Sequence, residues 1–105
     1  MKKLTVAELK PRDSRLLPDY LGDATVTGGG LFVFQPGQTA HSEERHVHDT
    51  NEVFIFVQGS GVLPIDGIDY SVQAGDVVIV EAGEDHHTRS SVDDPLVAAW
   101  YVMSQ

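Results

Sequence analysis

Short apolar segments separated by Gly, Pro and Asp run along most of this chain. They are rich in β-branched and aromatic residues, which favour strands, and turn signals recur at roughly 8–12-residue intervals. This pattern predicts strands at 31–35, 52–58, 61–65, 68–72, 77–80, 86–90 and 96–103. Many short strands with regular turn signals are typical of an all-β sandwich or barrel.

The segments 53–57 and 77–80 are apolar at successive positions and not only at alternate ones. Since neighbouring residues of a strand point to opposite faces, both faces of these strands must be covered. We expect one face to line the interior of a barrel. The other should pack on a second sheet or on a second subunit.

The dipeptide Asp66-Gly67 separates the segments 61–65 and 68–72. Asp-Gly tolerates the positive φ angles of a two-residue type I′ turn, so these segments should form a β-hairpin. Pro64 has no N–H to donate, which places its strand at a sheet edge or next to a bulge.

The first thirty residues carry weaker signals. Thr5 and Glu8 have the spacing of a helical capping box, but a short strand is an equally good interpretation of this segment. The run Gly28–Gly30 suggests a tight bend into the next strand. We therefore divide a single domain into an N-terminal arm (1–30) that packs on a barrel (31–105).

The chain has 105 residues, no Cys and a formal net charge of −9. The lack of Cys excludes disulfides, Cys-ligated zinc, iron–sulfur clusters and thiol nucleophiles. From Leu16 onward the chain has two basic and fourteen acidic residues. Because this excess of negative charge would repel phosphate groups, we expect neither nucleic acid nor membrane as a partner. A charge at Glu8 interrupts the segment that a signal peptide would need, which favours a cytoplasmic location.

All five histidines lie between positions 41 and 87. His46 and His48 share one face of a strand because side chains alternate with period two, and a turn-prone triplet then precedes Glu52. With the distant His86, these residues could form a set of three imidazoles and one carboxylate. Such a mixed N/O set suits one divalent transition metal ion, namely Fe, Mn, Ni, Zn or Cu.

The same residues carry a resemblance to the cupin superfamily over about positions 31–103. The first cupin motif, G-x5-H-x-H-x3/4-E-x6-G, is matched by His46-x-His48-x3-Glu52-x6-Gly59. The second motif, G-x5-P-x-G-x2-H-x3-N, is matched by Gly75-x7-Gly83-x2-His86. Three positions depart from the pattern, since Gly37 lies three residues too early and Glu81 and Ser90 replace Pro and Asn. None of the three is a ligand position.

The resemblance implies a double-stranded β-helix (jelly roll) of two antiparallel sheets with one metal ion, usually as a homodimer. It does not fix the reaction, because similar sites serve dioxygenases, lyases and isomerases as well as non-catalytic binding proteins. We expect a metal-dependent enzyme acting on a small organic molecule. A non-catalytic module that binds or senses a small-molecule ligand is the alternative.

Strand parity suggests what surrounds the metal. Phe54 and Phe56 should point to the same side as Glu52, and Trp100 or its neighbour Tyr101 should face the cavity. The result would be a mostly apolar pocket.

Three ambiguous side chains lie close to the proposed ligands in the sequence. Glu44 shares the parity of His46 and is a weak acid–base candidate. Motif spacing selects His86 over its neighbour His87, which should then face outward. His41 is interpreted as a solvated loop residue, with a lid role as the alternative.

Overall fold

A computed structural model describes residues 1–5, 8, 15–40 and 47–104 of the chain. Its elements in chain order are β1 (Lys2–Thr5), α1 (Leu16–Asp19), β2 (Thr25–Val33), β3 (Glu52–Gln58), β4 (Ser60–Ile65), β5 (Ile68–Gln73), β6 (Asp76–Val80), β7 (Arg89–Ser90) and β8 (Val97–Ser104). The segment around Thr5 is thus a strand up to that residue. The Thr5 hydroxyl donates a hydrogen bond to the Glu8 carboxylate (3.1 Å).

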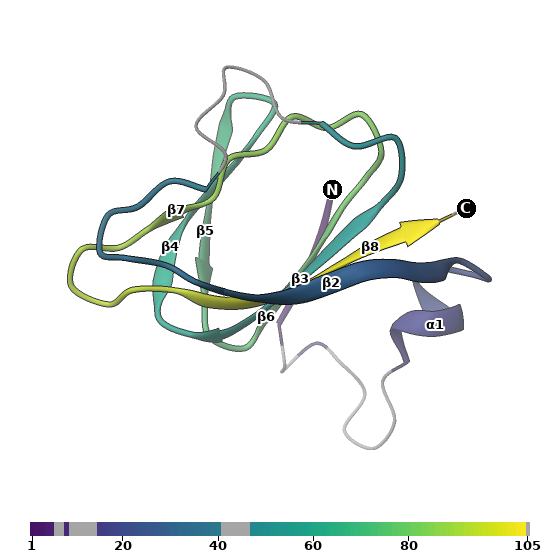
Figure 1. The fold of residues 1–105 in the computed structure, drawn as a ribbon, viewed down its shortest axis with the longest axis horizontal. Helices are drawn as coiled ribbons and strands as arrows, with labels where there is room; N and C mark the ends of the chain where they lie inside the picture. The colour runs from purple at the N-terminus through teal and green to yellow at the C-terminus, as the bar shows by residue number, and fades with distance from the viewer. Residues whose placement is uncertain (6–7, 9–14, 41–46, 105) are drawn as a thin grey trace.

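The strands form two sheets, and every paired set of strands is antiparallel. The first sheet has the order β1-β6-β3-β8-β2 and the second has the order β5-β4-β7. Figure 1 shows the smaller sheet standing at one side of the molecule and the larger sheet crossing beneath the interior. This arrangement confirms the all-β prediction with two antiparallel sheets.

Two clusters of buried side chains cover the two faces of the larger sheet. One fills the space between the sheets and is centred on Phe56, Leu63 and Leu96. The other lies on the opposite face, where Leu21 packs near Val53 and its neighbours. The doubly apolar strands β3 and β6 are therefore covered on one face by the second sheet. On the other face the N-terminal segment around α1 packs against them, where a second sheet or a second subunit was expected (Figure 1).

The β4–β5 hairpin has the predicted turn. Asp66 and Gly67 both have positive φ (48° and 81°), as a type I′ turn requires. The prediction that Pro64 lies on an edge strand is wrong, because β4 is the middle strand of its sheet. Pro64 pairs with Asp69 of β5, and on its other side its carbonyl oxygen accepts a hydrogen bond from the His87 N–H (3.4 Å), outside the β7 ladder of Gly61 and Val62.

Strand β2 begins earlier than the sequence suggested. The run Gly28–Gly30 belongs to this strand and does not form a bend, so that expectation is wrong. A Cβ on Gly29 would come within 2.5 Å of the backbone oxygen of Trp100, which explains why glycine lies there. The boundary drawn at residues 30 and 31 falls inside β2, whose residues from Thr25 to Val33 all belong to the larger sheet.

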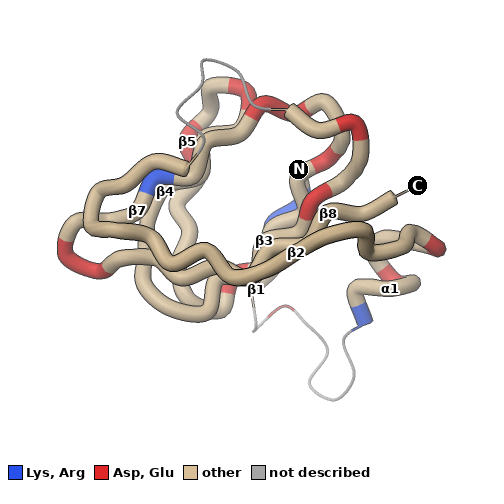
Figure 2. Tube along the Cα trace, in the orientation of Figure 1, with Lys and Arg blue, Asp and Glu red and all other residues tan. Residues whose placement is uncertain are grey.

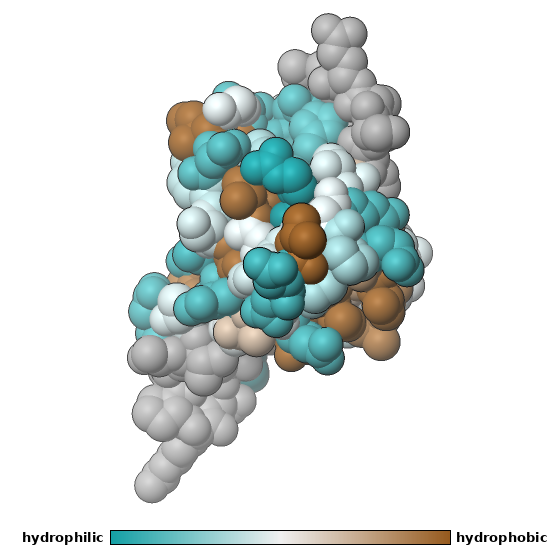
Figure 3. All heavy atoms as spheres, turned by 90° about the vertical axis from the view of Figure 1, so that its left-hand side faces the viewer, coloured by the Kyte–Doolittle hydropathy of each residue, from teal (hydrophilic) through white to brown (hydrophobic). Residues whose placement is uncertain are grey.

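Negatively charged side chains are concentrated in the loops (Figure 2). Figure 2 shows acidic residues mostly at turns and strand ends, with few basic residues among the described parts of the chain. Figure 3 shows a mainly hydrophilic face at the end of the molecule that carries the smaller sheet, with isolated hydrophobic side chains. Within the described residues, no helix has the length and apolar composition needed to cross a bilayer.

Candidate metal centre

Glu52, the first residue of β3, brings a carboxylate into the interior. Antiparallel pairing with Val80 of β6 on one side and Val102 of β8 on the other fixes its position in the larger sheet. The residue is only 4% exposed. Its Oε1 atom lies 2.9 Å from Nε2 of His86 and 3.2 Å from Nε2 of His48. A buried carboxylate is therefore shared by two imidazoles.

His86 is the most enclosed member of the group, with 1% of its surface exposed. It follows the turn after β6 and forms an isolated bridge with Ile65 at the end of β4. The predicted strand 86–90 is regular only at its last two residues, in β7. The backbone fixes the orientation of the ring, because Nδ1 donates a hydrogen bond to the Glu84 carbonyl oxygen at 3.0 Å. This bond directs Nε2 toward Glu52.

The pKa of His86 is raised above its ordinary value. Burial, the largest influence, lowers this pKa, but it is outweighed by the hydrogen bonds to Glu52 and to the Glu84 carbonyl together with the negative charges of Glu52 and Asp85. The Glu52 carboxylate thus favours the protonated form of the His86 imidazole. Metal-binding histidines commonly donate their second ring N–H to a backbone carbonyl, which leaves the other nitrogen for the metal. His86 has this arrangement.

Hydrogen bonds connect the two loops that carry the imidazoles. The Gly83 N–H donates to the His48 carbonyl oxygen (2.9 Å), and the Ala82 N–H donates to Oδ1 of Asn51 (3.1 Å). On the other side, the Asp66 N–H donates to the Asp85 carbonyl oxygen (2.8 Å), and the Asp85 N–H donates to Oδ1 of Asp66 (2.8 Å). The loop that bears His86 is therefore fixed to both neighbouring turns before any ligand binds.

The donor set fits a divalent transition metal. One ligand atom from each of His48, Glu52 and His86 can be chosen so that all three lie within 4.8 Å of one another. Two imidazole nitrogens and a carboxylate oxygen are donors that Fe(II), Mn(II), Ni(II), Zn(II) and Cu(II) accept. The predicted fourth ligand, His46, lies outside the described residues, as do Glu44 and His41.

His87 lies apart from this cluster. Its Nε2 atom is 2.9 Å from Oδ1 of Asp85, and the ring is partly exposed. Burial alternates along this segment, with His86 and Thr88 buried and His87 and Arg89 more exposed. The two neighbouring histidines therefore point to opposite sides, in the way that motif spacing suggested.

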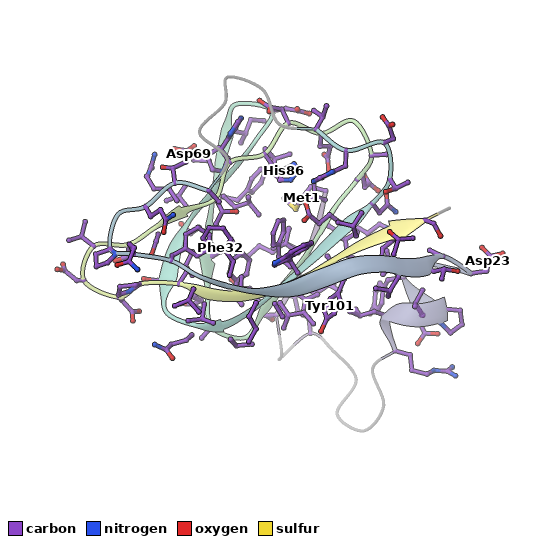
Figure 4. All side chains as sticks on the ribbon, viewed as in Figure 1. Met1, Asp23, Phe32, Asp69, His86 and Tyr101 are labelled. Atoms are coloured by element: carbon purple, nitrogen blue, oxygen red, sulfur yellow. The ribbon has the colours of Figure 1, made fainter. Side chains whose placement is uncertain are left out.

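A cavity of about 300 Å³ opens beside the cluster. Its lining residues come from strands β2, β3 and β8 of the larger sheet and from loop segments: Phe32, Phe34, Ala40, His48, Glu52, Phe54, Thr88, Ala98, Trp100 and Val102. Phe32 and Phe34 lie with their ring centroids 4.3 Å apart, and the Phe54 ring meets His86 edge-on at 6.0 Å. Figure 4 shows Phe32 and His86 on the inner side of the larger sheet and Tyr101 on its outer side.

The predicted pocket residues fall into two groups. Phe54 and Trp100 line the cavity, whereas Phe56 is not among the lining residues and is buried in the core beneath it. Of the last-strand pair, Trp100 is the inner residue. Phe32, Phe34 and Thr88 were missed by the sequence analysis. Their period-two spacing in 32–34 and 86–88 was a signal that could have identified them.

Comparisons with known proteins identify the family and the fold. The family described as Cupin domain matches residues 30–102. A cupin protein from Bacteroides fragilis has a similar structure, with a TM-score of 0.63 and 20% identity over 73% of this chain. The chain spans 64% of the length of that protein.

Two further solved structures share the fold. The protein plu4264 of Photorhabdus luminescens has a TM-score of 0.64 and 25% identity over 85% of this chain and 71% of its own. A protein from Thermotoga maritima, described as a predicted oxalate decarboxylase, has a TM-score of 0.60 and 23% identity over 75% of this chain and 68% of its own.

Proposed function

The chain belongs to the cupin family, and we propose that it is a metal-dependent enzyme acting on a small organic molecule. In this proposal His46, His48, Glu52 and His86 hold one divalent transition metal ion. The bound ion would supply Lewis-acid or oxygen chemistry of the dioxygenase, lyase or isomerase type. The description of the Thermotoga maritima protein as an oxalate decarboxylase is compatible with the lyase class.

One observation carries the proposal. The described part of the ligand cluster lies in the wall of a cavity, and His48 and Glu52 belong to both. Structural metal sites are normally closed by protein ligands, whereas a catalytic site keeps a position for substrate. A donor set that faces an empty volume of about 300 Å³ leaves room for such a position.

The residues around the ion have separate tasks. Glu52 would supply the negative charge of the donor set, while the Glu84 carbonyl accepts the Nδ1–H of His86 and holds that ring in place. The rings of Phe54 and Trp100 exclude water from the cavity wall. Electrostatic interactions are stronger in a site of this kind than in bulk water.

Non-catalytic binding or sensing of a metal-held small molecule is the second candidate. Among the described lining residues, His48 and Glu52 are the only acid–base groups, and both belong to the cluster itself. Such a lining suits a binding protein. An enzyme would then rely on the metal ion or on a residue such as Glu44.

Turnover separates the two candidates. The protein would be reconstituted with each of the five metals and assayed for oxygen uptake and product formation with diketones, enediols and uronates. Turnover that is lost in Glu52→Ala and kept in His87→Ala supports the enzyme. Saturable binding without turnover for every metal would overturn the enzymatic proposal in favour of the binding module.

We also propose that the chain forms a homodimer. Strand β2 is the end strand of the larger sheet, so one of its edges has no partner strand among the described residues. Leu31 and Val33 on this strand are 67% and 64% exposed. Pairing with a second copy would bury them and complete the edge.

A further inference from the structure

Five polar or charged side chains are buried among the described residues, and four have partners in hydrogen bonds or ion pairs. Glu52 and His86 contact each other, Asp76 accepts from the Gln73 N–H, and Ser90 accepts from the Leu96 N–H. Thr88 is the fifth and is 3% exposed. Within the part of the chain that the structure describes, its hydroxyl has no hydrogen bond.

Thr88 faces the candidate metal site. It is two residues from His86 on the same buried side of the segment, about 6.5 Å along the chain. It also lines the cavity together with His48 and Glu52. An unpaired buried hydroxyl is costly, and because Thr88 lines a cavity, a bound ligand can supply the missing partner.

The backbone around Thr88 is fixed from one side by a neighbouring segment. The Ala40 N–H donates to the Thr88 carbonyl oxygen at 2.8 Å, and Thr39 forms a bridge with Arg89. The hydroxyl is therefore held by a backbone that is ordered before a ligand arrives. A preorganised donor or acceptor of this kind contributes selectivity at little entropic cost.

The other walls restrict the ligand. Four aromatic rings line the cavity, those of Phe32, Phe34, Phe54 and Trp100. Rings of this type pack favourably against another aromatic or a flat apolar group. A volume of about 300 Å³ lies at the lower end of the range for small-molecule sites. A polyhydroxylated ligand would leave most of its hydroxyl groups without partners on these walls.

We propose that the Thr88 hydroxyl is a specificity-determining group that hydrogen-bonds a polar atom on the aromatic body of a small ligand whose other end binds the metal. The substrate class is therefore a compact aromatic molecule with a metal-binding head and one further hydroxyl, carbonyl or amine. This inference rests on the proposed function only because it places the ligand head at the same metal site.

Hydroxamates provide the test, since they bind divalent metals through two oxygen atoms. The probes are benzohydroxamate and its 2-, 3- and 4-hydroxy derivatives, measured by calorimetry with the cobalt(II)-loaded protein. At least one hydroxylated probe should bind about 3- to 10-fold more tightly than benzohydroxamate, the gain expected from one hydrogen bond. Thr88→Val should remove that gain, so that the hydroxylated probes no longer bind more tightly than benzohydroxamate, and Thr88→Ser should retain it.

The possible results are distinguishable. Two results overturn this inference without affecting the proposed metal site. One is a preference for the hydroxylated probes that is equally large in Thr88→Val, and the other is the lack of such a preference in the unmodified protein. If none of the four probes binds the cobalt-loaded protein, both this inference and the open metal site of the proposed function are wrong.

A second measurement does not depend on the metal. In metal-free protein, Thr88→Val should not lower the melting temperature, because no contact within the fold is lost. Ser90→Ala is the matched control and should lower it, since Ser90 accepts a hydrogen bond from the buried Leu96 N–H. A fall in melting temperature for Thr88→Val comparable to that of Ser90→Ala would show that the hydroxyl serves the fold, and would overturn the inference.

Discussion

Oε1 of Glu52 and Nε2 of His86 lie 2.9 Å apart although the two residues are separated by 34 positions in the chain. Because the other ring nitrogen of His86 donates to the Glu84 carbonyl, the short contact holds a proton between the imidazole and the carboxylate. A metal ion held by the same two atoms would displace that proton. Protonation of this pair should therefore affect both the stability of the metal-free fold and the binding of a metal ion.

The stability of the metal-free protein should depend on this pair. The raised pKa of His86 means that the folded state binds the proton more tightly than the unfolded state. The resulting stabilisation is fully present below pH 6.5, the ordinary pKa of histidine. It is lost as the pH rises through the raised pKa of the folded state. Thermal unfolding in the presence of a chelator, from about pH 6 to about pH 9, measures the effect.

Glu52→Gln is the informative variant, because it removes the main interaction that raises the pKa while preserving side-chain shape. The difference in melting temperature between the unmodified protein and Glu52→Gln should shrink as the pH rises. His87→Gln is the control and should keep the full pH dependence. A difference that stays constant or grows with pH would contradict the assignment of the proton to His86.

The two phenylalanines of β3 should respond differently to truncation. Phe56 is 1% exposed within the core, so Phe56→Ala should lower the free energy of unfolding by about 3–5 kcal/mol. Phe54 is only partly buried and one side of it faces the cavity, so Phe54→Ala should cost less and should change hydroxamate affinity. Urea denaturation and calorimetry measure both. Equal losses of stability would contradict this division between core and cavity wall.

Gly59, the last residue of the first cupin motif, should tolerate no side chain. Its φ is +84°, and a Cβ there would collide with the backbone of Asp94 and Pro95. Gly67 has a similar φ of +81° but nothing within 4 Å of the Cβ position. Gly67→Ala should therefore cost about 1–2 kcal/mol for its backbone conformation. Gly59→Ala should cost clearly more in urea denaturation, and equal costs would contradict the steric explanation.

Strand periodicity predicted the parts of the fold that depend on local sequence. The Asp66-Gly67 hairpin and the range of β3 follow from turn chemistry and from alternating side chains. The bend expected at Gly28–Gly30 was wrong because these residues continue strand β2, and the reason for glycine at position 29 is non-local. A neighbouring strand approaches too closely for a side chain, and no local pattern reports that contact.

The candidate site shows the same division. Motif spacing singled out His48, Glu52 and His86, which the structure brings together. The position of Pro64 could not be predicted, because the order of strands in the smaller sheet depends on the return of the chain at β7. The spacing of Thr88 from His86 could have placed it on the same side of the segment, but no sequence pattern reports that its hydroxyl lacks a partner among the described residues. Thr88 is singled out by the structure, because it is 3% exposed and its hydroxyl has no hydrogen bond among the described residues.

The proposed homodimer gives a further prediction. Val33→Lys introduces a charge on the end strand β2, where lysine opposes edge pairing, and should shift the protein toward monomer in size-exclusion chromatography with light scattering. Val92→Lys is the control, because Val92 is 69% exposed but lies in a turn. A protein that is monomeric without substitution, or a dimer that Val33→Lys leaves intact, would contradict the proposal.

The metal content of purified variants, measured by mass spectrometry after reconstitution and dialysis, tests the central claim most directly. The unmodified protein and His87→Ala should each retain about one transition metal ion per chain. His48→Ala, Glu52→Ala and His86→Ala should lose it, with affinity lowered by more than the roughly 10- to 100-fold expected from an outer contact. Metal retained by these three variants, or lost from His87→Ala alone, would contradict the account.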